Sequence, residues 1–85
     1  MAVNVLLKLN GKYRTTSARV GSHLPLVAVH ACDEIYMEDE DGIYRSLKNG
    51  EHRDRMLSAE DAVVWILKST KLTLIEQIEF SLGWI

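Results

Sequence analysis

An Asn-Gly pair near the start of the chain, Asn10–Gly11, is the feature that most constrains the fold. In the segment "VNVLLKL" before this pair, alternate positions carry Val3, Val5, Leu7 and Leu9. The segment after it, "KYRTTSARV", is rich in β-branched and aromatic residues. Asn and Gly tolerate the positive φ angles of a tight turn whose twist matches that of two paired strands. The sequence therefore predicts an antiparallel hairpin over residues 2–20.

A second Asn-Gly pair, Asn49–Gly50, lies between "IYRSLK" and "EHRDRML". These flanking segments alternate less regularly between apolar and polar residues than those of the first pair. The turn signal is the same, so we expect a second hairpin over residues 43–57.

The segment "SHLPLVAVHACDEIY", residues 22–36, connects the two predicted hairpins. At 100° per residue, one arc of a helix would contain Leu24, Val27, Ala28, Ala31, Cys32 and Ile35. Ser22 can serve as the N-cap, and Pro25 falls in the first turn, where its missing N–H does no harm. Val27 and Val29 also suit a buried strand. We favour the helix.

The segment "LSAEDAVVWILKST", residues 57–70, also predicts a helix. Ser58 is the expected N-cap, Asp61 occupies the capping-box position, and Lys68 lies near the negative C-terminal end. The face expected to be buried consists of Ala59, Ala62, Val63, Ile66 and Leu67.

The tail "KLTLIEQIEFSLGWI", residues 71–85, fits two structures. As a strand, it places on one face Leu72, Leu74, Ile78, Phe80, Leu82 and Trp84, with Glu76 as the exception. As a helix, it brings together Leu74, Ile75, Ile78, Leu82 and Ile85. Thr73 and Glu76 would then form a capping box. Only the strand accounts for Phe80 and Trp84, so we favour the strand.

The predicted order is hairpin, helix, hairpin, helix, strand, in a single small α+β domain spanning residues 1–85 with an antiparallel or mixed sheet. This order is similar to that of ubiquitin-like β-grasp domains, and the "KLNGK" turn resembles the first hairpin of that fold. The chain ends in Gly83–Trp84–Ile85 rather than in a double-glycine tail. The resemblance therefore does not imply conjugation chemistry.

Composition excludes some classes of protein. The 85 residues are 47% hydrophobic and 26% charged, which predicts a folded chain. The net charge of −2 argues against a dedicated binder of phosphate backbones. A single cysteine cannot form an internal disulfide. Because no signal peptide or long apolar segment is evident, we expect a cytoplasmic protein without membrane contact.

Six acids lie between Asp33 and Asp41, a segment that overlaps the sequence "EIYMEDEDGIYRSL", residues 34–47. If Gly42 is placed at the sixth position of a calcium loop, Met37 and Lys48 occupy the first and last ligand positions, which need oxygen ligands. We therefore expect no metal site. We interpret the stretch first as a solvated helix-to-strand connection. A second interpretation is a contact surface for a basic partner, formed by Glu38, Asp39, Glu40 and Asp41.

His30, Cys32 and the distant His52 are candidate groups for nucleophilic or ligand-binding chemistry. A thiolate nucleophile needs a nearby base. In a helix, however, Cys32 falls on the apolar arc and His30 points about 160° away from it. We predict a buried structural thiol, no cofactor and no zinc site.

Basic residues are concentrated on the predicted hairpins, with Tyr13 and Tyr44 among them. They are Lys8, Lys12, Arg14, Arg19, Arg45, Lys48, Arg53 and Arg55. If they shared one face of the sheet, they could bind a single nucleic-acid strand by charge and stacking. Alternatively, they are solvated cations that discourage pairing at strand edges.

Large apolar residues near the end of the chain suggest an interface. Trp65 lies at the margin of its helix's predicted buried face, and Trp84 and Ile85 end the sequence. Such residues either close a thin core or contact another chain, and homo-oligomerisation would enlarge the core.

No catalytic constellation is evident, so elimination favours a non-enzymatic protein-binding module, such as an adaptor, an inhibitor or an accessory subunit. It would use the acidic segment 38–41 and the apolar tail, Trp84 and Ile85. One alternative is a nucleic-acid-binding domain that uses the hairpin cations. The other is an enzyme or ligand-binding subunit around His30, Cys32 and His52.

Overall fold

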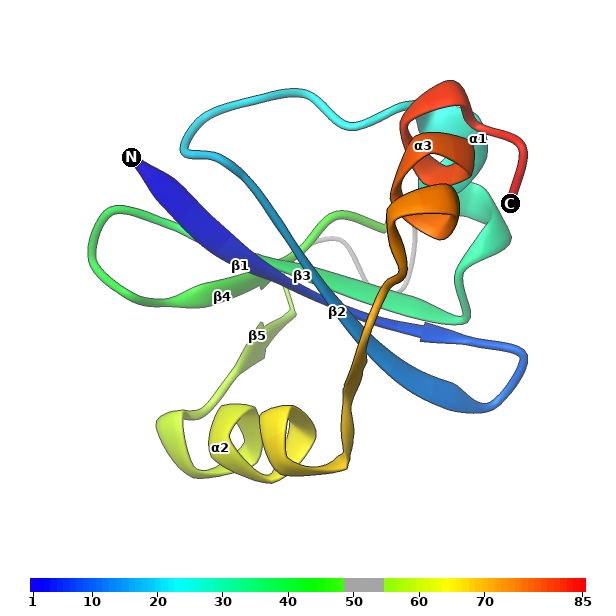
Figure 1. Ribbon diagram of the computed structural model, residues 1–85. Coiled ribbons are helices and arrows are strands. Elements are labelled where there is room, and N and C mark those ends of the chain that lie inside the picture. The colour runs from blue at the N-terminus through cyan, green and yellow to red at the C-terminus, as the bar shows by residue number, and fades with distance from the viewer. Residues whose placement is uncertain (49–54) are drawn as a thin grey trace.

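A mixed six-stranded sheet with helices on both faces forms the structure (Figure 1), which is a computed structural model describing residues 1–48 and 55–85. The strands are β1 (Ala2–Leu9), β2 (Lys12–Arg19), β3 (Glu34–Glu38), β4 (Tyr44–Ser46), β5 (Met56–Leu57) and β6 (Thr70–Lys71). The helices are α1 (Leu26–Ala31), α2 (Ala59–Lys68) and α3 (Leu74–Leu82). The strand order is β5-β4-β3-β1-β2-β6, and β6 pairs with β2 in parallel. The predicted α+β class is confirmed.

The first predicted hairpin is confirmed. β1 and β2 pair antiparallel, with Leu9 opposite Lys12. Both turn residues have positive φ, 51° at Asn10 and 78° at Gly11, as a tight turn of this kind requires. In the second predicted hairpin, β4 and β5 also pair antiparallel, with Arg45 opposite Met56. The turn at Asn49–Gly50 lies outside the described residues.

The helix predicted over residues 22–36 is much shorter in the structure. α1 begins after Pro25, and the predicted N-cap Ser22 lies outside it. The last three residues of the segment begin β3, which pairs antiparallel with β1 on one side and with β4 on the other. Ile35 and Tyr36 are fully buried on opposite faces of the sheet. A strand covered on both faces has no polar alternation, so its apolar run looks like part of a helix.

The tail is a helix, so the strand prediction for it was wrong. The Thr73 hydroxyl accepts a hydrogen bond from the Glu76 amide, and the Glu76 carboxylate accepts one from the Thr73 amide. This capping box begins α3, and Gly83 ends it with a φ of 76°. Phe80 is 4% exposed and points to the sheet, which the helix had been expected to prevent.

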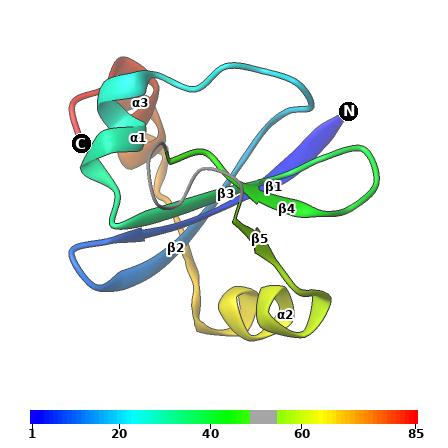
Figure 2. The same ribbon diagram turned by 180° about the vertical axis from the view of Figure 1, so that it is seen from behind.

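The helices cover the two faces of the sheet unequally (Figures 1 and 2): α1 and α3 lie side by side on one face and α2 on the other. The buried cluster on the first face, here called the α1–α3 core, comprises Val3, Val5, Leu7, Ala28, Val29, Cys32, Ile35, Met37, Leu72 and Phe80. The cluster on the second face, the α2 core, comprises Leu6, Tyr36, Tyr44, Ala62 and Trp65.

The α2 helix is confirmed. Of the face predicted to be buried, Ala62 is buried, whereas Ala59, Val63, Ile66 and Leu67 are exposed. Ser58 caps the helix by accepting a hydrogen bond from the Asp61 amide. Trp65, rather than Val63 or Leu67, enters the α2 core. Val63 and Leu67 are 56% and 80% exposed. The contact of the large indole with the sheet decides which side of the helix faces inward.

Candidate functional site

The acidic segment 38–41 forms the turn between β3 and β4, so it connects two strands and not a helix to a strand. The Asp39 carboxylate accepts hydrogen bonds from the backbone N–H of Asp41 (2.9 Å) and of Ile43 (3.0 Å). Its other oxygen accepts from Arg45 Nε at 3.0 Å. The hydrogen bond from the Ile43 N–H is the main reason why the pKa of Asp39 lies below its usual range. Asp39 therefore organises the turn.

The other three acids of the segment have different surroundings. Glu38 accepts a hydrogen bond from the Asn4 backbone N–H at 3.2 Å, whereas Glu40 and Asp41 are exposed. A groove runs beside the turn, and the residues that line it include Val20, Met37 and Leu47 together with the acids of the segment. The lining combines apolar side chains with four acids and one cation, Arg45, which pairs with Asp39. Such a groove is chemically suited to a basic segment that also carries apolar side chains.

Cys32 is a buried thiol, as predicted. It is 2% exposed, and its Sγ donates a hydrogen bond to the Ala28 carbonyl oxygen at 3.3 Å. Burial raises the pKa of Cys32 to about 11, so the thiol is protonated at neutral pH. His30 is exposed on α1, and His52 lies outside the described residues. Within residues 1–48 and 55–85, no three potential metal-ligating side chains gather at one place.

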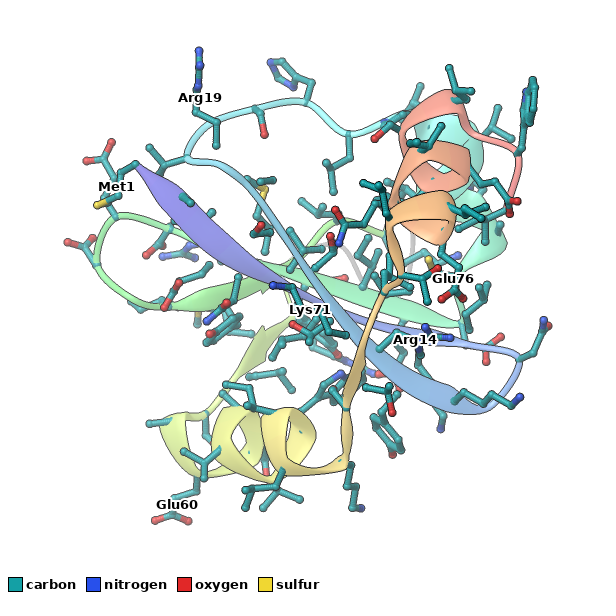
Figure 3. All side chains as sticks on the ribbon, viewed as in Figure 1. Met1, Arg14, Arg19, Glu60, Lys71 and Glu76 are labelled. Atoms are coloured by element: carbon teal, nitrogen blue, oxygen red, sulfur yellow. The ribbon has the colours of Figure 1, made fainter. Side chains whose placement is uncertain are left out.

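Several of the hairpin cations have partners. Arg14 forms an ion pair with Glu76 and donates to the Thr70 carbonyl oxygen at 3.2 Å, which ties β2 to the segment leading into α3 (Figure 3). Arg45 pairs with Asp39, Arg55 lies 3.6 Å from Glu34, and Lys48 Nζ donates to the His30 carbonyl oxygen at 3.0 Å.

The described cations do not share one face of the sheet. The pairing registers place Lys8 and Tyr13 on the α2 side. Arg19, at the end of β2, points away from α2 (Figure 3). They place Lys12, Arg14 and Arg45 on the α1–α3 side. Tyr44 is buried in the α2 core, and Arg53 lies outside the described residues. The sheet therefore does not bring the described members of the set into one basic surface.

A large apolar surface lies on α1, α3 and the tail, and Trp84 is the only one of its residues that the sequence had indicated as a contact. We call it the α1–α3 face, and it consists of Leu26, Val27, Leu74, Ile75, Ile78, Leu82 and Trp84, each 52–77% exposed. α1 and α3 lie side by side in both views (Figures 1 and 2), and a Cβ at Gly83 would be 3.3 Å from that of Val27. The helical spacing of the α3 residues was visible in the sequence, but the sequence did not show that these side chains point to solvent.

The two predicted protein-contacting elements lie apart. Trp84 belongs to the α1–α3 face, whereas Ile85 is half-buried against the α1–α3 core. The β3–β4 turn with its acids is at the opposite end of the molecule from the C-terminus (Figures 1 and 2). They are therefore two separate surfaces.

A second exposed apolar surface lies on α2. We call it the α2 face, and it consists of Val63, Val64, Ile66 and Leu67, which are 41–80% exposed. It lies on the opposite side of the sheet from the α1–α3 face (Figure 1). Both layers of helices thus present aliphatic side chains to solvent.

Comparison of the chain with protein-family models, with curated proteins and with solved structures finds no match. Among the helices of the described residues, none combines the length and the apolar character needed to cross a bilayer.

Proposed function

We propose that this chain is a non-enzymatic protein-binding module and that the α1–α3 face is its main contact surface. The observation that carries the proposal is the exposure of seven large apolar side chains on this face, by 52–77%. Together they expose an apolar area on the order of 800 Å², whereas the largest apolar patch of a typical monomer is about 300–600 Å². One partner of a standard protein–protein interface buries about 800 Å².

The chemistry of the α1–α3 face favours a protein partner. The α3 sequence, LIEQIEFSL, contains two glutamates and no Lys or Arg. Helices that bind membrane surfaces usually carry a polar face rich in cations, and nucleic-acid binding also depends on cations. An aliphatic surface with a tryptophan, here Trp84, is typical of contacts with an apolar helix or patch of another protein.

The acidic turn is a second proposed contact. Glu38, Glu40 and Asp41 border an apolar groove and can attract a basic segment of a partner, while Asp39 maintains the turn. Because this site and the α1–α3 face lie at opposite ends, they can engage different parts of one partner or two partners. Such an arrangement suits an adaptor, an inhibitor or an accessory subunit. The resemblance of the element order to β-grasp domains stays a hypothesis.

The test is affinity capture from lysate of the source cells, with nuclease present, followed by mass spectrometry. Ile78→Glu places a charge in the α1–α3 face at a residue that is 52% exposed, so the fold should tolerate it. Met56→Glu is the matched control, because Met56 is 53% exposed but lies in β5. We expect at least one stoichiometric partner with the wild type and with Met56→Glu, and its loss with Ile78→Glu.

The proposal is wrong if Ile78→Glu captures the same proteins in the same amounts as the wild type. If a parallel capture without nuclease retains proteins and the capture with nuclease retains none, the nucleic-acid alternative is favoured instead. Variants with Glu40→Lys and Asp41→Lys test the second contact separately, and we expect them to weaken capture of a basic partner.

A further inference from the structure

The α2 face forms an apolar stripe that points away from the sheet. Glu60, Val63, Val64 and Leu67 follow the i, i+3, i+4, i+7 spacing that places residues on one side of a helix. Figure 3 shows Glu60 directed away from the sheet. Trp65 and Ala62 hold the opposite side of the helix in the α2 core. The exposed aliphatic residues are therefore not needed to attach the helix.

A groove accompanies this stripe between α2 and the β3–β4 turn. The residues that line it include Ile43, Leu57, Ala59, Ala62, Val63 and Ile66. Ala59, an exposed residue of this lining, has a small side chain and leaves space beside it for an aliphatic side chain of a second molecule. Ile66, also in the lining, is 41% exposed on the same helix.

The charges of α2 are separated along its axis. Glu60 and Asp61 lie in the first turn and Lys68 in the last turn. This distribution suits the helix dipole. It also makes the helix electrostatically complementary to a second copy of itself in the antiparallel orientation, because acids then face lysines at both ends.

We propose that α2 pairs antiparallel with α2 of a second copy of this chain, around a two-fold axis that passes near Val64. A helix rises about 1.5 Å per residue. Because residues 60 and 68 are equally far from residue 64, the axis brings Glu60 level with Lys68 of the second copy. It likewise brings Val64 level with Val64 of the second copy, in the middle of the apolar stripe. An interface of this kind is isologous, so each contact occurs twice.

The exposed apolar area suits a small interface. The four residues of the α2 face and Ile43 expose on the order of 400 Å² per copy, about half of the about 800 Å² of one side of a standard interface. The α2 face lies across the sheet from the α1–α3 face (Figure 2). The dimer would therefore leave both copies of the α1–α3 face accessible, and it does not depend on the function proposed for that face.

Sedimentation equilibrium over micromolar concentrations tests the dimer. We expect the mass of two chains for the wild type and of one chain for Leu67→Glu, whose side chain is 80% exposed and contributes little to the fold. Leu74→Glu is the matched control, since Leu74 is 73% exposed but lies on α3, and it should remain dimeric. Circular dichroism verifies that both variants are folded. A monomeric wild type, or a dimer that Leu74→Glu breaks and Leu67→Glu does not, overturns the proposal.

Charge exchange tests the antiparallel orientation. Glu60→Lys and Lys68→Glu each replace two attractive contacts with two repulsive ones, and each should weaken self-association by about tenfold or more. An equimolar mixture of the two variants restores opposite charges at both ends and should form a heterodimer with wild-type affinity. If the single changes have no effect, or if the mixture does not recover, the helices do not pair in this way.

Discussion

The helices on the two sides of the sheet are attached to it by different kinds of buried side chains. On the α1–α3 side, two helices cover a cluster of ten buried residues in the described part of the chain, and seven of these residues are aliphatic. On the α2 side, a single helix covers five, and three of them are aromatic: Tyr36, Tyr44 and Trp65. The first side depends on many small contacts, and the second on a few large ones. A single substitution of a buried residue should therefore lower the free energy of unfolding more on the α2 side than on the α1–α3 side.

Trp65 is the centre of the α2 side. Its ring packs edge-to-face against Tyr13 and Tyr36, with centroids 4.8 and 5.4 Å apart. Lys8 and Lys68 place their Nζ atoms 5.2 and 5.3 Å from the Tyr13 ring centroid. The indole Nε1 is buried and has no hydrogen-bond partner among the described residues. The contribution of Trp65 is therefore that of its ring and not of its N–H group.

The largest expected effect is that of Trp65→Ala. Removing a buried tryptophan costs about 4 kcal/mol of unfolding free energy, because no other large side chain of α2 reaches the sheet. Ile35→Ala, at a fully buried position of the α1–α3 core, should cost about 3 kcal/mol. Urea denaturation followed by circular dichroism measures both.

Trp65→Phe is the control for this pair, since it keeps a ring and removes an N–H that lacks a partner. It should cost about 1 kcal/mol, as a conservative change of a packed side chain does. A smaller loss for Trp65→Ala than for Ile35→Ala would contradict the difference between the two sides.

The next effect concerns the end of α3. Gly83 has a φ of 76°, and an added Cβ would lie 3.3 Å from the Cβ of Val27. Gly83→Ala should therefore cost about 2 kcal/mol, from backbone strain together with the close contact. Gly21 has the same φ of 76° with nothing within 4 Å, so Gly21→Ala should cost about 1 kcal/mol from the strain alone. Equal losses in thermal unfolding would show that the contact with α1 adds nothing.

The N-caps of α2 and α3 give a smaller difference. Thr73→Ala removes one half of a reciprocal capping box and should cost about 1.5 kcal/mol, whereas Ser58→Ala removes a single capping bond and should cost about 1 kcal/mol. The denaturation midpoints of the two variants measure this difference in stability. Thr73→Ser, which retains the hydroxyl, is the control. A larger loss for Ser58→Ala than for Thr73→Ala would contradict the expected difference between the two caps.

The smallest effect is confined to acidic solution. The hydrogen bond from Arg14 is the main reason why the pKa of Glu76 falls from 4.5 to about 2. Because the folded protein favours the ionised carboxylate, this stabilisation is present above about pH 4.5 and is lost as the pH falls toward 2. Comparing the unfolding midpoints of the wild type and of Glu76→Gln across this range should show a difference that shrinks with acidification. Arg14→Gln should reduce the pH dependence in the same way, and an unchanged dependence would contradict the role of the pair.

The sequence was sufficient where the cause of a structure is local. The Asn10–Gly11 turn follows from the φ angles that these two residues tolerate, and the start of α2 follows from the Ser58 cap. The capping box of α3 was also readable, although the alternation of the tail led us to favour a strand. Signals of this kind act within a few residues of the chain.

Sequence-distant contacts decided the candidate surfaces. The acids of the 38–41 segment look alike in the sequence, but only Asp39 accepts the hydrogen bonds that organise the β3–β4 turn. The exposure of the hairpin cations on different faces likewise follows from the pairing registers. The number of acids or cations in a segment does not show which of them organise a turn or share a surface, because these roles depend on the direction of each side chain.

The sequence by itself determined the α+β class, the first hairpin, the α2 helix and the burial of Cys32. Only the tertiary structure decided that residues 34–38 are a strand, that Trp65 is buried while Trp84 is exposed, and that two apolar faces remain uncovered. The physical reason is the separation along the chain of the residues that interact. Turns and caps depend on backbone angles and hydrogen bonds between near neighbours, whereas the inward side of a helix depends on which distant side chains, here Tyr13 and Tyr36, it meets.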